Sequence, residues 1–362
     1  MKRRQFLTAA GTGLAAGAVA SPAIAQSMPE LKWRLTSGFP KSLDTLYGTA
    51  ELFVRYVSEA TDGKFQIQPF APGEIVGTPQ ATDAVANGTV EMTHTASYYY
   101  VGKDPTYALG TAIPFGLNSR QMTAWAYHGG GLDLLNEFYG RQNLYSLPGG
   151  NTGTQMGGWF RKEIKTVEDL KGLKFRIAGL AGQVMQKLGV VPQQIPGGDI
   201  YPALERGTID AAEWVGPYDD EKLGFAKVAP FYYFPGFWEG SAMTNFFFNL
   251  GKWNELPKNY KAIVQAAAAY AHGDMQAKYD TRNPAALRRL LIAGAQLRPF
   301  SEDTLDAAYK ASNELFDEIS AKNVDFKKIY DSLRAFRNDE YFWFQVAEYR
   351  FDNFMIRARG RG

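Results

Sequence analysis

Three charged residues, Arg176, Glu213 and Glu239, have the types and positions needed to bind a small anion together with a cation. Arg176 lies in the strand-like stretch KFRI, and a guanidinium there can hold a carboxylate through two parallel hydrogen bonds. Glu213 follows the stretch IDAA, and Glu239 follows the aromatic loop FYYFPGFW. Two carboxylates in one cleft repel each other, so one is protonated unless a cation lies between them. Such oxygen ligands suit a hard cation; the alternative is that both carboxylates are solvated.

Aromatic and amide side chains could complete such a site. Tyr98, Tyr99 and Tyr100 follow a predicted strand, in which alternation would direct Tyr98 and Tyr100 to one face and Tyr99 to the other. Some of them should line the site and donate a phenol hydrogen to a substrate oxygen, and the sequence leaves open which. The remaining candidates are an apolar wall of Trp214, Phe237 and Trp238, for which burial in the core is the alternative, and two weaker polar residues, Asn151 and Asn245.

Several common chemistries are excluded by composition. The chain has no cysteine, which excludes disulfide scaffolds, cysteine–zinc sites, iron–sulfur clusters and cysteine nucleophiles. Its three histidines, His94, His128 and His272, are not spaced as a metal pair, and the nucleophile-elbow and phosphate-loop motifs are missing. Without the three basic residues at positions 2–4, 36 basic residues face 37 acidic ones. Such a nearly neutral body argues against nucleic acid or an anionic membrane as the main partner.

The elements that must position these residues alternate between strand and helix. The alternation runs through 31–95 and again through 166–214, which is typical of α/β units. The segments DAVANGTVEMTHT (83–95) and PALERGTIDAAEW (202–214) also align without gaps, so we expect two similar lobes. The chain should cross between them within 111–160 and near 215–250. Because ligands of α/β sheets bind at the carboxyl ends of strands, the default site is the cleft between the lobes.

The two ends of the chain differ from this pattern. Residues 1–25 have a basic start, an uncharged run and the small-residue motif Ala-Ile-Ala, with a twin-arginine pair at Arg3 and Arg4. They predict an export signal, with a mature chain from Gln26. After residue 251 the sequence is helical: one helix should end at Pro284, a second should be capped by Ser301, and 326–357 should form an aromatic-rich third. These helices would clamp the lobes or contact another subunit.

Segment 163–214 carries a family resemblance. It contains TVEDLKGLKFR, LGVVP and ALERGTID in that order, and together they resemble the signature of the solute receptors of TRAP (tripartite ATP-independent periplasmic) transporters. GEIVGTPQATDAVANGTVEMTHTASYYY (73–100) resembles the first-lobe motif of the same family. The resemblance covers about 31–250 well and the remainder loosely. It implies a two-lobed α/β periplasmic binding protein of the type II, Venus-flytrap kind, with mixed sheets and long C-terminal helices.

The resemblance also implies an organisation and partners. A twin-arginine-type signal peptide, 1–25, would precede lobe I in 26–150 with returning C-terminal segments, lobe II in 151–250, and a helical region in 251–362 that crosses both lobes. The protein would act in the periplasm. Its partners would be a small carboxylate ligand and the small and large membrane subunits of the transporter, without nucleic acid, and the C-terminal helices could form a homodimer.

The site residues look closest to the branch of the family that binds α-keto acids or lactate with a metal ion. In that branch Arg176 would hold the substrate carboxylate, and the metal ligands would be Gln155, Glu213, the backbone oxygen of Trp214, and Glu239. The substrate-binding set implied is Arg176, Gln155, Tyr99, Tyr100, Trp214 and Asn151. Two carboxylates, the substrate and Arg176 sum to −2, so Ca²⁺ would neutralise the site and Na⁺ would leave −1. The family nevertheless favours Na⁺, with Ca²⁺ as the alternative.

The expected function is therefore a non-enzymatic receptor for pyruvate or a related 2-oxo acid, which delivers it to the permease for sodium-driven uptake. A lactate or C4-dicarboxylate receptor of the same fold is one alternative. An exported metal-dependent keto-acid lyase is another, although it lacks an obvious general base because a metal-bound carboxylate is a poor one.

Overall fold

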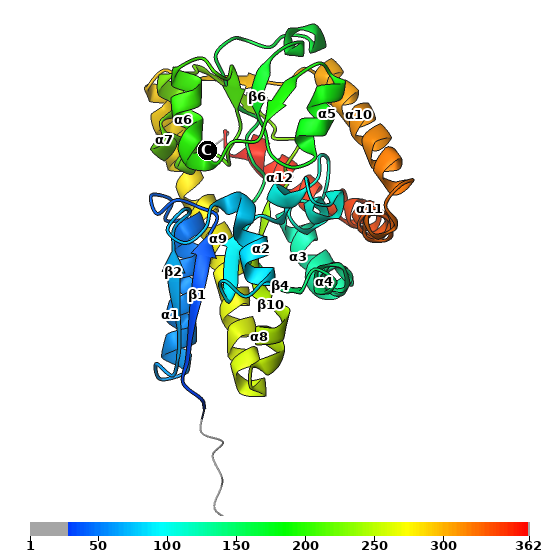
Figure 1. Ribbon diagram of the computed structural model, residues 1–362. Coiled ribbons are helices and arrows are strands. Elements are labelled where there is room, and N and C mark those ends of the chain that lie inside the picture. The colour runs from blue at the N-terminus through cyan, green and yellow to red at the C-terminus, as the bar shows by residue number, and fades with distance from the viewer. Residues whose placement is uncertain (1–27, 361–362) are drawn as a thin grey trace, which may run out of the picture.

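The computed structural model describes residues 28–360, so the predicted export signal lies outside the described residues. These residues form two lobes, each built around one mixed sheet with helices on its faces, as expected from the alternation of strands and helices (Figure 1). The first sheet lies in the lower lobe of Figure 1 and the second in the upper lobe. None of the described helices is long and apolar enough to cross a membrane.

The first sheet has the strand order β2-β1-β3-β10-β4. Its strands are β1 (Leu31–Ser37), β2 (Phe65–Phe70), β3 (Met92–Thr95), β4 (Leu144–Asn151) and β10 (Met243–Asn249). The helices of this lobe are α1 (Leu46–Ala60), α2 (Ala81–Ala86), α3 (Ser119–His128), α4 (Gly131–Gly140) and α8 (Leu250–Glu255). β1 is parallel to both neighbours, whereas β10 is antiparallel to β3 and β4.

The second sheet has the strand order β11-β9-β5-β8-β6-β7. Its strands are β5 (Gly158–Phe160), β6 (Lys174–Arg176), β7 (Val191–Gln193), β8 (Ala211–Ala212), β9 (Phe231–Phe234) and β11 (Gln296–Pro299). Its helices are α5 (Ala181–Lys187), α6 (Gly197–Glu205), α7 (Pro217–Leu223) and α10 (Glu302–Ser320). The aligned segments of the two lobes are α2–β3 and α6–β8, and Gly88 and Gly207 follow the two helices with φ of +80° and +71°. A left-handed residue there favours glycine, which explains the shared motif.

The chain passes from the first sheet to the second in the loop around 151–157 and returns in the loop around 235–242. These two loops are joined by backbone hydrogen bonds such as Thr152 N to Ala242 O, 3.1 Å. The loop around 111–118, which stays within the first lobe, contacts them through Phe115 N to Phe237 O, 2.7 Å. The strand 243–249 belongs to the first sheet, although the sequence grouped it with lobe II in 151–250. Its apolar run FFFN has no periodicity that distinguishes one sheet from the other.

The C-terminal region departs from the sequence expectation at two points. α9 (Lys258–Ile292) continues through Pro284, where we had expected it to end, because Ala286 and Leu290 are buried beyond the proline and offset its cost. The segment expected as one helix over 326–357 is two helices, α11 (Val324–Phe344) and α12 (Glu348–Ala358). The cap at the start of α10 is confirmed, since Ser301 Oγ accepts from Thr304 N at 3.2 Å.

Candidate ligand-binding site

Arg176 lies at the end of β6 and is 1% exposed. Its Nη1 donates to the backbone oxygen of Glu213 at 2.8 Å and to Glu213 Oε1 at 2.5 Å, and its Nε donates to Ile195 O at 3.0 Å. The indole of Trp214 lies against the guanidinium, with 5.1 Å from Cζ to the ring centroid. The Nε and Nη1 atoms of the guanidinium therefore already donate to protein acceptors. A bidentate contact with a substrate carboxylate would need two nitrogens free.

Glu213 lies beside Arg176 because of the register in which β8 pairs with β6. β8 runs parallel to β6 with Ala212 opposite Arg176, and Glu213 follows directly. Glu213 Oε1 also accepts from Ala178 N at 3.1 Å, whereas its Oε2 has no hydrogen-bond partner. Burial raises the pKa of this carboxyl, and the positive charge of Arg176 opposes that rise.

Glu239 reaches the same place from the loop after β9. Its backbone oxygen accepts from Gln155 N at 3.1 Å, which ties the two crossing segments together. The side chain is 2% exposed, and its Oε2 has no partner. Burial raises the pKa of Glu239 well above its usual range, and repulsion from Glu213 adds to that effect. Both effects favour the protonated form of Glu239 in the protein alone.

Six of the fourteen buried side-chain polar atoms that lack a partner among the described residues belong to residues selected from the sequence. These six atoms are Gln155 Oε1, Glu213 Oε2, Glu239 Oε2, Asn151 Nδ2, Trp214 Nε1 and Trp238 Nε1. Native proteins leave few such groups unpaired, since each costs about 1–3 kcal/mol. Three of the six are acceptor oxygens of the expected metal ligands, and a hard cation prefers oxygen ligands of this kind. The donor set therefore fits a cation.

This set is not a dense acidic cluster. Among residues 28–360, no three His, Cys, Asp or Glu side chains gather in a way that could hold a metal ion. A cation here would need the amide oxygen of Gln155 and a backbone carbonyl in addition to the two carboxylates. A group completed by neutral oxygens suits Na⁺ or Ca²⁺ better than a transition metal.

The three tyrosines adopt a different local structure from the expected one. Ser97–Tyr100 is a turn of 3₁₀ helix, so the predicted alternation of an extended chain is wrong. The ring of Tyr98 lies near Glu239, and burial raises the pKa of Tyr99 to about 12 although the nearby Arg176 opposes the rise. Tyr100 lies apart from this group, because its hydroxyl donates to Thr78 O at 3.0 Å and Thr95 Oγ1 at 3.2 Å.

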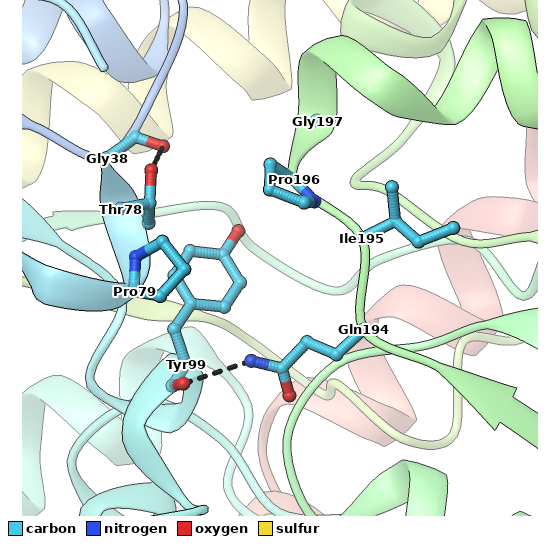
Figure 2. A pocket seen from close by; sticks show the side chains of 8 residues that line it. All are labelled: Gly38, Thr78, Pro79, Tyr99, Gln194, Ile195, Pro196 and Gly197. Atoms are coloured by element: carbon cyan, nitrogen blue, oxygen red, sulfur yellow. Dashed lines mark hydrogen bonds between the residues drawn. The ribbon is translucent and has the colours of Figure 1, made fainter. Parts of the chain in front are cut away.

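Two cavities adjoin the charged group and share Tyr99. The inner one is lined by Phe39, Leu46, Ala96, Tyr98, Tyr99, Thr152, Gln155, Trp214, Val215, Ala242 and Thr244. The outer one is lined by Gly38, Thr78, Pro79, Tyr99, Gln194, Ile195, Pro196 and Gly197. Figure 2 shows the Tyr99 ring between Pro79 of one lobe and Pro196 of the other. Gln194 Nε2 donates to Tyr99 O at 3.0 Å and bridges the lobes there.

Among the sequence candidates, only Tyr98, Tyr99, Gln155 and Trp214 line these cavities, and Arg176, Glu213 and Glu239 lie behind the lining residues. Asn151 Oδ1 accepts from Gly153 N at 2.9 Å, and Asn245 Nδ2 donates to Ser146 Oγ at 3.2 Å within the first sheet. Phe237 and Trp238 pack with other aromatic rings in a core cluster, as their alternative interpretation proposed.

Sequence reasoning missed most of the residues that line the cavities. Phe39 and Thr152 follow the carboxyl ends of β1 and β4, and Ile195 follows that of β7. The rule that ligands bind beyond the carboxyl ends of strands applies to all three. Extending it to every strand predicted within 31–95 and 166–214 would have found Phe39 and Ile195, whereas no strand was predicted before Thr152.

Comparisons with known proteins agree with this geometry. Residues 36–323 match the model of the bacterial extracellular solute-binding proteins, family 7. A monocarboxylate 2-oxoacid-binding periplasmic protein of Nostoc sp. is 49% identical over 360 residues, which is 98% of this chain and 99% of the relative.

Two solved structures are also similar over most of the chain. A TRAP transporter solute-binding protein from Bordetella bronchiseptica is 52% identical with a TM-score of 0.91, covering 92% of this chain and 99% of that one. It is described as a mixed-occupancy dimer with calcium and picolinate in one site. A TRAP solute-binding protein from Pseudoalteromonas atlantica with sodium and pyruvate is 37% identical with a TM-score of 0.87, covering 90% and 99%. This chain therefore belongs to family 7 of the bacterial extracellular solute-binding proteins (DctP) and is a TRAP transporter solute-binding protein.

Proposed function

We propose that this receptor binds a small 2-oxo monocarboxylate, such as pyruvate, in the periplasm and delivers it to the membrane subunits of its transporter. The observation that carries the proposal is the set of unpaired buried oxygens of Gln155, Glu213 and Glu239 beside Arg176. The Nostoc relative, named for 2-oxo acids, and the pyruvate in the P. atlantica structure support it.

Arg176 and a metal ion would share the anion. The proposed metal ligands are Gln155 Oε1, Glu213, the backbone oxygen of Trp214, and Glu239. The ion would supply positive charge for the substrate's carboxylate and 2-oxo oxygens together, which selects 2-oxo or 2-hydroxy acids over plain carboxylates. Because Nη1 of Arg176 already donates to Glu213, Arg176 would stabilise the anion mainly through its positive charge and through its remaining N–H donors. Tyr98 and Tyr99 would line the site, whereas Tyr100 and Asn151 would support the loops that carry it.

We propose Na⁺ as the resident ion. The sodium and pyruvate of the P. atlantica structure support this choice, whereas the calcium of the B. bronchiseptica structure and the charge balance favour Ca²⁺. Calorimetry on chelator-treated protein would decide the ion. Pyruvate binding in NaCl with excess chelator supports sodium, and binding that returns only after Ca²⁺ addition contradicts it.

The substrate class is tested by the same calorimetry. Pyruvate and longer 2-oxo acids should bind more tightly than lactate, and acetate and succinate should bind weakly. Equal affinities for pyruvate and acetate would refute the chelate, and no heat with any 2-oxo acid would refute the substrate class. Tighter binding of malate or succinate would indicate the C4-dicarboxylate alternative.

The proposal includes the absence of catalysis. The carboxylates near the ligand, Glu213 and Glu239, would be metal ligands, and a metal-bound carboxylate is a poor general base. Prolonged incubation with pyruvate, followed by NMR, should return unchanged pyruvate. Formation of product would favour the exported lyase.

We also propose a homodimer through the C-terminal helices. α12 has no buried residue, and an apolar surface on α11 and α12 is exposed at Tyr341, Phe342, Trp343, Val346, Tyr349, Phe351, Phe354, Met355 and Ile356. So large an apolar surface is typical of an interface, and the dimer of the B. bronchiseptica relative supports a second copy as its occupant. Sedimentation should show a dimer that F351D converts to monomer, while I292D, at an exposed position of α9, should not. A monomeric wild type would refute the dimer.

Finally, we propose that the export route is the twin-arginine one. The pair Arg3-Arg4 supports this route. Replacing both arginines by lysine should leave the full-length precursor in the cytoplasm, and normal export of that variant would refute the route.

A further inference from the structure

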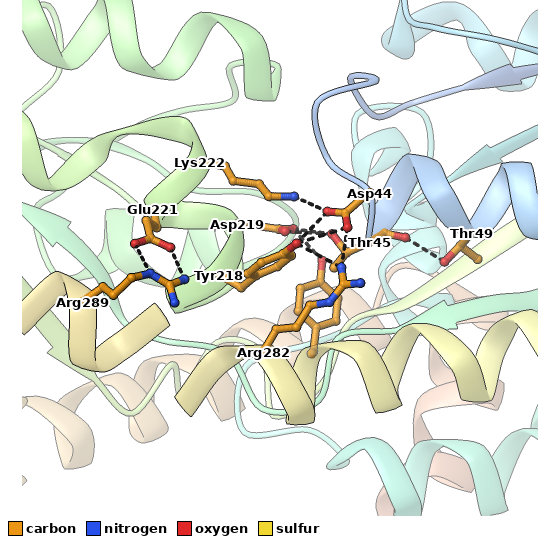
Figure 3. Close-up of polar contacts among 10 residues, drawn as sticks. Asp44, Thr45, Thr49, Tyr218, Asp219, Glu221, Lys222, Arg282 and Arg289 are labelled. Carbon is orange, nitrogen blue, oxygen red and sulfur yellow. Dashed lines mark hydrogen bonds and ion pairs between the residues drawn. The ribbon is translucent and has the colours of Figure 1, made fainter. Parts of the chain in front are cut away.

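A second interlobe contact, away from the cavities, is built around the carboxylate of Asp219. Thr45, which precedes α1 in the first lobe, donates its hydroxyl to Asp219 Oδ1 at 2.8 Å and Oδ2 at 3.0 Å. Tyr279, on the long helix α9, donates its hydroxyl to Asp219 Oδ2 at 2.6 Å. Asp219 itself lies on α7 of the second lobe (Figure 3). All three residues are buried, and we refer to them as the Asp219 junction.

A more exposed layer of charges surrounds the junction. Asp44 of the first lobe accepts from Tyr218 at 3.1 Å and forms ion pairs with Lys222 and Arg282 (Figure 3). The side chain of Asp44 is 47% exposed. Exposed ion pairs contribute little because water screens them and long side chains lose freedom. The buried hydroxyl-to-carboxylate bonds should therefore contribute most of the attraction between the lobes at this point.

The opposite side of α7 is tied to the ligand-binding loop. Asp220, the next residue, accepts from Val215 N at 3.3 Å and from the side chains of Trp159 at 3.0 Å and Tyr232 at 2.7 Å. Val215 follows Glu213 and Trp214 directly in the chain. Neighbouring carboxylates on one short helix thus face opposite ways: one holds the loop that carries the metal ligands, and the other reaches across to the first lobe.

We propose that the Asp219 junction couples ligand binding to lobe closure. A bound ligand fixes the loop 213–216, and α7 moves with that loop because Asp220 is hydrogen-bonded to it. Asp219 is then in position to accept hydrogen bonds from Thr45 and Tyr279. The proposal rests on the proposed function for the identity of the ligand. Thr45, Asp219 and Tyr279 are positioning residues, since none of them lines either cavity.

The geometry explains why the junction would respond to closure. Thr45 and Asp219 belong to different lobes and are both 0% exposed, so in this arrangement of the lobes water does not reach their contact. When the lobes separate, water replaces the contact, and the closed state loses a charge-assisted hydrogen bond. Beside the outer cavity the lobes are also bridged by the hydrogen bond from Gln194 to Tyr99 O. The junction should therefore control how long the closed state lasts.

The test compares Thr45→Val and Tyr279→Phe with Thr49→Val in the mature chain. Thr49 is the matched control: it is buried in the first turn of α1, one turn after Thr45, but its hydroxyl donates to Thr45 O and not to the second lobe (Figure 3). Stopped-flow kinetics with pyruvate and the resident ion would give association and dissociation rates. Thr45→Val and Tyr279→Phe should each raise the dissociation rate about tenfold with little change in association rate. Equal rates for Thr45→Val and Thr49→Val would overturn the proposal.

Lobe separation gives a second readout that a purely structural role would not move. The chain has no cysteine, so two cysteines introduced at the exposed positions Glu59 and Arg206 can carry spin labels on opposite lobes. Thr45→Val should shift the distance distribution toward longer values with ligand present, and Thr49→Val should leave it unchanged.

The proposed substrate and the proposed role of the Asp219 junction are refuted by different measurements. If the wild type shows no binding heat with any 2-oxo acid, the proposed substrate is refuted. The junction is then judged on the ligand-free distance distribution alone. A longer distance in Thr45→Val than in Thr49→Val supports it, and identical distributions refute it.

Discussion

The protein buries two pairs of carboxylates, Glu213 with Glu239 and Asp219 with Asp220. The pairs differ in whether every carboxylate oxygen has a hydrogen-bond partner. Glu213 and Glu239 each retain an oxygen without a hydrogen-bond partner. Asp219 and Asp220 are equally buried, yet all four of their oxygens accept hydrogen bonds from hydroxyl, indole or backbone groups. Burial alone therefore does not identify a ligand site in this molecule.

The difference separates binding from positioning. A buried acceptor that the protein leaves unpaired costs free energy until a ligand or ion supplies the missing partner. A buried acceptor that the protein pairs completely holds elements together instead. Replacing a carboxylate by its amide should consequently lower mainly ligand binding in the Glu213–Glu239 pair. In the Asp219–Asp220 pair it should lower mainly the stability of the ligand-free protein.

The largest effect is expected at Arg176, the only positive charge in contact with Glu213 among the described ion pairs. Arg176→Ala should weaken 2-oxo acid binding by about 3 kcal/mol, because it removes the cation and leaves a buried carboxylate uncompensated. Arg176→Lys keeps the charge without the planar fork and should lose less. Calorimetry measures both, and thermal unfolding checks that each variant is folded. Unchanged affinity in a folded Arg176→Ala would remove the arginine from the site.

The next largest effect is expected at Asp220. In Asp220→Asn, an amide NH₂ must face groups that donate, namely Val215 N or the side chains of Trp159 and Tyr232. The ligand-free protein should therefore lose about 2 kcal/mol of unfolding free energy, measured by urea denaturation at neutral pH. A variant as stable as the wild type would contradict the view that this pair is structural.

The α7 pair also predicts how stability changes with pH. Burial raises the pKa of Asp219 to about 6 and that of Asp220 to about 7, from an ordinary value near 3.8. Between these values the native state binds more protons than the unfolded chain, so the unfolding free energy falls as pH rises from about 4 to about 7. Urea denaturation across that range should show the fall, and Asp220→Asn should reduce its slope. A wild-type curve that rises over the range would refute the assignment.

The smallest effect on the ligand-free protein is expected at Glu239. Burial and Glu213 raise its pKa and so favour the neutral form, which the amide of Glu239→Gln imitates. The substitution should therefore change stability at pH 6 by less than about 0.5 kcal/mol. The same variant should lose the stabilisation that ion and pyruvate give the wild type. A strong destabilisation without ligand would place Glu239 in the same class as Asp220.

Part of the fold followed from local chemistry. The alternation of strand and helix and the glycines that end α2 and α6 were readable, because left-handed residues and periodicity leave a local signal. The sequence did not predict that β10 belongs to the first sheet or that α9 continues through Pro284. Both depend on packing against residues far away in sequence, and local propensity carries no information about that.

The site was predictable to a similar degree. Arg176 and Glu213 could be brought together because each ends a strand, and strand ends meet at one edge of a sheet. The family resemblance added Gln155 and the pairing with Glu239, which lie on crossing loops without a pattern of their own. Tyr100 was grouped with Tyr99 only because a strand was assumed where the chain forms a 3₁₀ turn.

The position of β10 has a consequence for synthesis. It lies between β3 and β4, yet the chain reaches it only after most of the second lobe, and the second sheet receives its edge strand β11 later still. A nascent chain that stops after β4 would have two unpaired strand edges where β10 belongs. Neither lobe can then be completed in the order in which ribosomes produce it, so the native fold is reached only when nearly the whole polypeptide is available.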